Sequence, residues 1–528
     1  VLGLVAKLAR EWKGEVDFTW DHSRRQSQSP FNSPFFTPAG TTALSNGTID
    51  LLRDTSVYPI DFQPYLTGTT VNGPLRFTLR NLTGRLAGPL GSVLAGQPTL
   101  SVLAEARENL SDDNIELRRT STVFRPWRSQ SAVSAQAELR IPLASPTWNL
   151  PLVKELEVQL SGRTESTVTN GATSQVTVGA TTPIVRDRNR VRSTDPTIGI
   201  RWKPIENLAF RASYGTGFLP PNGFQLTESA PAVSTATLTA DPRRGNTPWS
   251  GFIQMSGGNP DLNSESSRNW AAGMIITPRF ARGLRISFDY SRLEKSDAIG
   301  ALGSINNVIV LEPLFPGKFI RGAKLPGDPA DWAGPIVSFD NRLFNISSQE
   351  LEAYDVRFDY EVPTSFGRVE VYGMATWTES LTVQILPTAP VRETLDFTDG
   401  PLRLKTSFGA TWRRGNWTGG WNGRHLNSHR SAQSTQVANT TVTTDALQHR
   451  VKSQVYHDFF IGYRFASGAS RPDGLLRDLL ARTTVQVGAR NVFNREPPFD
   501  PGAGGWGYRS PLGDARLAQY YISAARSL

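Results

Sequence analysis

The 528-residue chain contains no cysteine, which excludes disulfides and thiolate metal sites, and no run of about 18 or more apolar residues, which excludes a transmembrane helix. Its formal charge of +9 comes with arginines scattered along the chain rather than gathered in a basic block, so we do not expect nucleic acid among its partners. Abundant glycine, proline, serine, threonine and asparagine favour an all-β fold with many loops.

Strands are predicted wherever apolar and polar residues alternate, because alternate side chains of a strand share one face. The N-terminal segment 1–10 is interpreted as a strand, and a second strand is predicted at 15–20. A long polar loop is expected over 21–73. Further strands of the first half are predicted at 75–79, 100–107, 133–141, 156–160 and 198–202.

The clearest alternation lies in the stretch 207–293. Two strands are predicted there, at 208–215 and 284–291, with a long loop between them. Their polar faces carry Arg211, Arg285 and Asp289, which suits a wet interior better than the dry core of a β-sandwich. We expect these charges either to line a path for a charged ligand or to satisfy one another and a neighbouring domain.

The second half repeats the same pattern. Strands are predicted at 356–361, 369–377, 404–412, 417–423, 455–465, 483–493 and 517–528, which brings the total to about 17. Short turns alternate with long loops, and aromatic residues gather near strand ends, as in outer-membrane barrels. A set of soluble β-sandwiches is the alternative, and charges on nearly every polar face argue against it.

Three segments around the central stretch resemble TonB-dependent outer-membrane receptors: "LAFRASYGTGFLPPNGFQL", "GGNPDLNSESSRNWAAGMIITP" and "GLRISFDYSRLEKSDAI". A fourth, "TVQVGARNVFNREPPFDP", resembles the penultimate strand of that family. Leu219 stands where the first family motif has arginine, Ala515 where the closing strand has proline, and Leu528 where the chain end has an aromatic residue. The resemblance assigns these family-motif positions: Phe218, Pro220, Pro221, Asn259, Pro260, Leu262, Glu265, Asn491 and Phe493.

The resemblance implies a transmembrane antiparallel β-barrel in the outer membrane of a Gram-negative bacterium. The family's barrel has about 22 strands, so residues 1–528 are expected to form one barrel domain of about 17 strands, with a plug and about five strands encoded upstream. The implied function is energy-coupled import of a scarce ligand such as an iron chelate, cobalamin or a saccharide. The implied partners are a TonB-type motor acting through the plug, the small or oligomeric ligand, and outer-membrane lipid with lipopolysaccharide. A passive channel or surface-binding barrel is the alternative.

Long loops commonly carry function, so selectivity is predicted to lie in 216–266 and 295–349. Asp241, Arg243 and Trp249 are the candidate ligand-binding residues there. Four of the five histidines, His425, His429, His449 and His457, surround one predicted hairpin, where they are either a metal or haem contact or incidental. The glycine-rich run 502–507 lacks a following helix and is interpreted as a loop. No catalytic motif and no cofactor are predicted.

Overall fold

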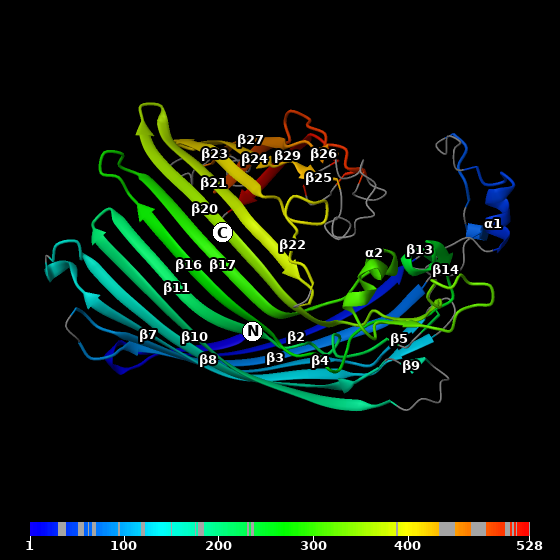
Figure 1. The fold of residues 1–528 in the computed structure, drawn as a ribbon. Coiled ribbons are helices and arrows are strands. Elements are labelled where there is room, and N and C mark those ends of the chain that lie inside the picture. The colour runs from blue at the N-terminus through cyan, green and yellow to red at the C-terminus, as the bar shows by residue number, and fades with distance from the viewer. Residues whose placement is uncertain are drawn as a thin grey trace.

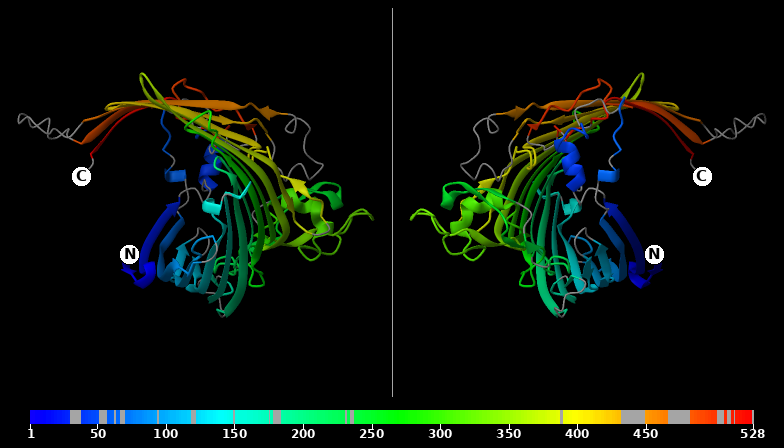
Figure 2. Two further views of the ribbon diagram at one scale, coloured as in Figure 1. Left: turned by 90° about the vertical axis from the view of Figure 1, so that its left-hand side faces the viewer. Right: turned by 90° about the vertical axis from the view of Figure 1, so that its right-hand side faces the viewer.

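In a computed structural model, the chain is built almost entirely of antiparallel strands that curl into a curved sheet (Figures 1 and 2). The structure describes residues 1–29, 38–50, 57–61, 63–65, 70–92, 95–117, 122–148, 150–174, 176–177, 184–229, 232–233, 237–386, 389–431, 449–465, 482–501, 507–508, 512–513 and 515–526. Most of the glycine-rich run 502–507 and Leu528 lie outside these residues.

Within this part of the chain the main sheet has 21 strands, of which four are short extensions and 17 form a continuous meander. The 17 are β1 (Leu2–Lys7), β2 (Lys13–Ser29), β3 (Thr70–Pro89), β4 (Thr99–Ser111), β7 (Arg128–Ala144), β8 (Glu155–Ala172), β10 (Arg186–Ile205), β11 (Leu208–Leu219), β16 (Glu265–Ile276), β17 (Leu284–Gly300), β20 (Phe344–Thr364), β21 (Gly367–Gln384), β23 (Leu404–Arg414), β24 (Trp417–Leu426), β27 (Gln454–Arg464), β28 (Thr483–Arg490) and β29 (Gln519–Arg526). The all-β antiparallel fold and the predicted number of strands are therefore confirmed.

The remaining elements belong to the loops and to the edges of the sheet. The extensions are β5 (Asn114–Leu117), β6 (Thr122–Arg125), β9 (Val176–Thr177) and β22 (Arg392–Glu393). Separate small sheets contain β12 (Ala232–Val233), β13 (Leu238–Asp241), β14 (Thr247–Trp249), β15 (Ile253–Met255), β18 (Phe319–Arg321), β19 (Ile336–Asp340), β25 (His429–Arg430) and β26 (Arg450–Val451). The helices are α1 (Pro38–Ser45) and α2 (Ile305–Val308), with 3-10 turns η1 (Ala9–Glu11), η2 (Gln63–Tyr65), η3 (Pro146–Trp148), η4 (Pro242–Arg244) and η5 (Ile309–Leu314).

None of the helices in the described part of the chain is long and apolar enough to span a membrane.

The register of the meander places apolar side chains on one face of the sheet and charged side chains on the other. One row of paired residues runs Trp202, Phe210, Met274, Phe288 and Val356 across five strands. The adjacent row, on the opposite face, runs Arg201, Arg211, Gly273, Asp289 and Asp355. Strict alternation thus produces one apolar face and one charged face, as the sequence predicted.

The large apolar side chains of the first face are exposed on nearly every long strand. They include Phe18, Trp20, Leu82, Val133, Ile198, Ile200, Phe288, Val356, Trp377, Phe459, Ile461 and Val487. A soluble sheet would bury such a face, because a continuous apolar surface of this extent is unfavourable in water. Contact with lipid explains the exposure.

Turns at one end of the sheet are short, and the connections at the other end are long. The β23–β24 hairpin has only Gly415 and Asn416 between its strands, and Gly415 takes the positive φ of 55° that a two-residue hairpin needs at its first central position. The long connections carry α1, α2 and the small sheets, and α2, β13 and β14 lie together beyond the strand ends (Figure 1). The predicted alternation of turns and loops is confirmed.

Several predicted loop boundaries were wrong, because strands extend beyond the alternating segments. Both ends of the predicted loop 21–73 belong to β2 and β3, and β17 continues to Gly300. The loop predicted between the strands 208–215 and 284–291 was also wrong, because it contains the whole of β16 (Glu265–Ile276). Outside the apolar band both faces of a strand meet water, so polar residues occupy both faces and alternation disappears. Backbone pairing continues there without a sequence signal.

Among the described residues, β1 pairs only with β2 and β29 pairs only with β28. These two strands lie at the two edges of the curved sheet (Figure 2).

We expect the two faces of β17 to respond oppositely to a new charge. Phe288→Arg puts a cation on the apolar face, where Phe288 is 42% exposed, and should cost about 2–4 kcal/mol near the bilayer midplane. Ser291→Arg is the matched control, because Ser291 is exposed on the charged face between Ala271 and Ala353. Outer-membrane yield and heat-modifiable migration should fall for the first variant only. Equal behaviour would contradict the assignment of the faces.

Candidate functional site

The two longest described loops fold into one body, which we call the loop cap (residues 237–264 and 301–343). Strand β15 of the first loop pairs in parallel with β19 of the second, and β18 pairs with β19 on its other side. An apolar core joins both loops and contains Leu238, Phe252, Leu302, Ile305, Val308, Ile309, Phe315, Phe319, Ile336 and Phe339. Leu238 and Phe252 come from the first loop and the other eight residues from the second, so side chains of both loops pack into one core.

A buried ionic cluster lies beside this core. Arg321 donates to both carboxylate oxygens of Asp241, at 2.9 and 3.0 Å, and to both of Glu312, at 2.8 and 2.7 Å. Burial alone would lower the pKa of the Arg321 guanidinium, but these hydrogen bonds to Glu312 and Asp241 outweigh it and raise the pKa. Arg243 supplies the second cation, 3.1 Å from Glu312, so two carboxylates are balanced by two guanidinium groups.

A second buried pair stabilises the turn after β13. Arg244 binds both oxygens of Asp328, at 2.7 and 2.9 Å, and donates to the Ala333 carbonyl at 2.7 Å. Its guanidinium lies 5.2 Å from the ring centre of Trp332. The bidentate geometry explains how both charges can be buried without a free polar group.

A third ionic group attaches the loop cap to the chain that leaves β11. Asp340 is bound by Lys318 at 3.0 Å and by Arg342 at 2.9 Å, and Arg342 also pairs with Glu228. Burial raises the pKa of the Asp340 carboxyl, but Arg342 and Lys318 outweigh this effect and lower it to about 2.

The three candidate ligand residues occupy different positions in the loop cap. The Asp241 side chain is 0% exposed and its oxygens are saturated by Arg321 and the Arg243 amide, which leaves it out of reach of a ligand in this structure. The Trp249 indole is half-buried against the core and donates to the Ile336 carbonyl at 2.8 Å. Arg243 is 57% exposed. Ligand binding by these residues stays a prediction, and Arg243 is the one whose charge faces solvent.

The structure brings the two family-motif segments together over the ends of β8 and β10. The backbone N–H of Asn259 donates a hydrogen bond to the Gln225 carbonyl at 2.7 Å, and Leu262 and Pro221 are buried. Gln130 of β7 donates to the Pro221 carbonyl at 3.1 Å. Phe218 and Pro220, which precede this contact, are half-buried. The motif prolines therefore fix where the chain turns from the barrel wall into the loop.

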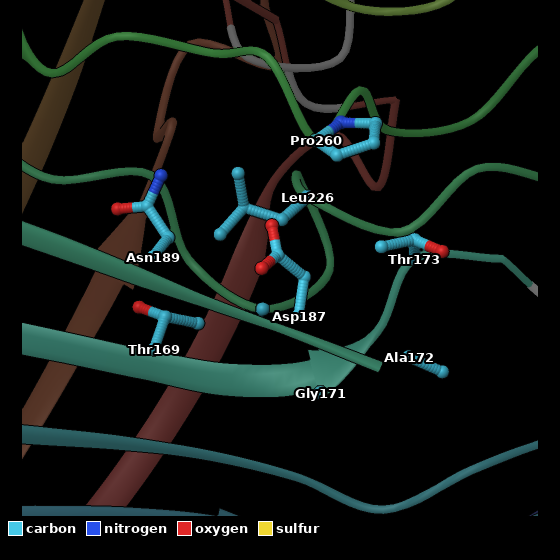
Figure 3. A pocket seen from close by; sticks show the side chains of 9 residues that line it. Thr169, Gly171, Ala172, Thr173, Asp187, Asn189, Leu226 and Pro260 are labelled. Carbon is cyan, nitrogen blue, oxygen red and sulfur yellow. The ribbon is translucent and has the colours of Figure 1, made fainter. Parts of the chain in front are cut away.

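A small pocket lies beneath this contact. Figure 3 shows Leu226 and Pro260 on one side of it and Thr169, Asp187 and Asn189 on the other. The last three come from the charged face of β8 and β10, so the motif segments fold over the inner side of the sheet at its loop end.

The other motif positions are structural contacts that the sequence did not specify. Glu265 is buried, forms an ion pair with Lys295 at 2.6 Å and accepts the Ile299 amide at 2.6 Å. Asn491 takes a positive φ of 47° directly after β28 and its side chain closes a turn with Arg495. Phe493 is exposed and packs edge-on against His457.

The charged face of the sheet is lined by ion pairs around an open concavity. Arg211 binds Asp289 at 2.6 Å, and Arg140 binds Glu157 at 2.8 Å. Ser213 and Ser291 also line this concavity. Arg357 binds Asp359 at 2.8 Å further along the wall. These charges satisfy one another, which is one of the two expected arrangements.

The clustered histidines do not converge. His429 is buried against Asp500 at 2.9 Å, whereas His457 accepts the Trp421 indole N–H within the sheet. In the described part of the chain no group of three His, Cys, Asp or Glu residues is arranged to hold a metal ion.

The fold and the loop architecture define a transmembrane β-barrel with a structured outer end. The chain belongs to the TonB-dependent receptor family: its residues 2–492 match the family described as "TonB dependent receptor-like, beta-barrel". Members of this family are receptors and transporters in the outer membrane of Gram-negative bacteria rather than enzymes.

Two solved structures share the fold. The ferric citrate transporter FecA in its unliganded form matches 97% of this chain with a TM-score of 0.53 and 11% identity. The pyoverdine outer-membrane receptor FpvA from Pseudomonas aeruginosa PAO1 matches 99% of it with a TM-score of 0.55 and 11% identity. The chain spans 58% and 60% of the lengths of these two proteins. No curated protein matched the sequence.

We expect Arg321→Met to unfold the loop cap while leaving the barrel intact. The change removes the cation that the carboxylates of Asp241 and Glu312 share. Breaking a buried ion pair in this way costs about 3–5 kcal/mol. Arg243→Met removes an exposed partner and should cost about 1 kcal/mol or less. Peptide-level hydrogen exchange over 237–264 and 301–343 measures the difference, with the barrel strands β16 and β17 as the internal reference. Equal protection in both variants would contradict it.

We also expect the loop cap to lose stability in acid through Asp340. Its pKa is about 2 when folded and about 3.9 in an unfolded chain, so the unfolded form takes up the proton first as the pH falls. The contribution, about 2–3 kcal/mol, is complete above about pH 5 and is lost progressively as the pH falls from about 5 to below 2. Hydrogen exchange in the Asp340→Asn variant should lack this acid step, whereas Asp331→Asn, at an exposed carboxylate, should keep it.

Proposed function

We propose that this chain is the barrel of a receptor for energy-coupled import across the outer membrane, and that its loop cap carries the ligand selectivity. The observation that supports the proposal is the folding of two long loops into one body around a shared core and buried ion pairs. A passive channel needs an open mouth, whereas a receptor needs a preorganised surface. The proposal treats residues 1–528 as one barrel domain that works with a plug coupled to the TonB-type motor.

The loop cap offers an exposed surface that suits ligand contact. Ile253 and Ile320 are 46% and 44% exposed, and both pair with Ser338 across the small sheet. Arg243 adds an exposed cation. Its carboxylate partner, Glu312, also binds Arg321. Apolar contacts with a few placed polar groups are the usual composition of a ligand site.

An iron chelate is the first ligand class to test. The two similar structures are described as a ferric citrate transporter and a pyoverdine receptor, which supports this class over cobalamin and saccharides. Chelates that carry carboxylates would also suit the Arg243 guanidinium.

The experiment compares uptake and binding for a panel of ferric citrate, a ferric hydroxamate, cobalamin and a maltooligosaccharide. The protein is produced in the outer membrane of a host that lacks its own receptors for these ligands. We expect saturable uptake of one class, which stops when the proton gradient is collapsed. Uptake that continues without the gradient would refute energy coupling and favour the passive channel.

We expect Arg243→Gln combined with Ile253→Asp and Ile320→Asp to weaken binding of the imported ligand at least about tenfold, as loss of central contacts commonly does. Deleting a loop would be a poorer test, because it would also remove side chains from the core that the two loops share. Arg279→Gln and Arg282→Gln, in the exposed turn between β16 and β17 at the opposite end, are the controls. Unchanged affinity in the triple variant, with hydrogen exchange over the cap intact, would place selectivity elsewhere.

A further inference from the structure

Four arginines occupy alternate positions on β10: Arg186, Arg188, Arg190 and Arg192. All four are exposed, and alternate residues of a strand share one face. The same face continues into Ile198, Ile200 and Trp202, which are large, apolar and exposed. One side of a single strand therefore changes from apolar to cationic along its length. The intervening residues Asp187 and Asn189 belong to the inner pocket of Figure 3.

The position of these arginines relative to the membrane follows from the length of the strand. Trp202 lies near the short turn that leads to β11, and its indole donates to the Leu152 carbonyl at 2.9 Å. A tilted transmembrane strand crosses the bilayer core in about 9–11 residues. Counting from Trp202, the crossing ends near Arg192. The other three arginines then rise through the outer headgroup region, about 6.6–6.8 Å apart along the strand.

No carboxylate in the described part of the chain neutralises this row. Within the described residues none of the four side chains forms an ion pair. Their partners across β8 are Ala172, Asn170, Val168 and Ser166, all uncharged. Arg186 has an aromatic contact, with its guanidinium 4.6 Å from the ring centre of Trp127.

Some arginines on the same outer face of other strands are neutralised by carboxylates. Arg80 pairs with Glu108 at 3.1 Å, and Arg292 pairs with both Glu294 and Glu350. The β10 row is thus an uncompensated strip of positive charge, directly above the apolar band.

We propose that this row binds the phosphate groups of the phosphorylated glycolipid of the outer leaflet, the lipid A part of lipopolysaccharide. Guanidinium groups bind phosphate oxygens through paired hydrogen bonds, and four of them in line match several phosphates rather than one. Continuity with the lipid-facing apolar residues below favours a membrane lipid over a soluble anion. The acyl chains would lie along Ile198 and Ile200 while the phosphates meet Arg192 and Arg190.

The test uses the protein extracted from outer membranes of a Gram-negative host, with all four arginines changed to glutamine (R186Q, R188Q, R190Q, R192Q). The control removes four exposed arginines at the short-turn end (R10Q, R279Q, R282Q, R414Q). Native mass spectrometry measures binding of purified bisphosphorylated lipid A, dephosphorylated lipid A and phosphatidylglycerol. We expect the first variant to bind bisphosphorylated lipid A at least about tenfold more weakly than wild type or control. Wild type, glutamine variant and control should bind dephosphorylated lipid A with equal affinity.

A lysine version of the four changes retains the charge but loses paired hydrogen bonding, and should bind with intermediate affinity. If the glutamine variant does not assemble, the pairs R186Q/R188Q and R190Q/R192Q carry the test, each with a smaller loss. Unchanged lipid A binding in the glutamine variants would overturn the proposal. So would equal binding of phosphatidylglycerol, or competition by millimolar inorganic phosphate, which would point to an unspecific anion effect.

Discussion

The barrel wall, on which the rest of the structure is built, depends on the need to satisfy backbone N–H and C=O groups where water is absent. In a bilayer only helices and closed β-barrels meet that requirement, and an unsatisfied group costs several kcal/mol. Between its two edge strands the described chain contributes a meander in which each strand pairs with the next along the sequence. A register shift of one residue would move the apolar side chains of a strand to the opposite face, and the two-residue hairpin at Gly415 restricts the register there.

The two faces of this hydrogen-bonded sheet meet different solvents, and each solvent determines which side chains are favourable on its face. Lipid selects Phe288 and Val356 on one face, while water on the other permits Arg211 and Asp289 to pair at 2.6 Å. The outer end follows a different rule, because the loop cap must exclude water from its core without help from lipid. Its apolar side chains form one core, and beside that core Arg321 binds two buried carboxylates, which leaves little unpaired charge.

The strand β10 connects these environments. Its inner face contributes Asp187 and Asn189 to the pocket under the family-motif segments, and its outer face presents the arginine row above Ile198. A receptor anchored to phosphorylated lipid along this strand would hold the adjacent loop base in a defined orientation. The lipid contact and the loop architecture would then act on the same region from opposite sides.

The order of side chains along the strands predicted the fold class and the face that meets lipid, because period-two alternation is a local property. It missed β16, whose sequence does not alternate strictly. A local pattern could not, however, predict the role of Asp241 in the fold. Its burial depends on Arg321 and on a core shared by two loops far apart in the chain, and no spacing within either loop encodes that contact. Leu219 could be recognised as a departure from a motif, yet only the folded chain showed Pro221 and Pro260 meeting over β8 and β10. The positions of the strand ends beyond the apolar band also depended on the tertiary structure. Backbone pairing continues there although both faces of the strand carry polar residues and the sequence no longer alternates.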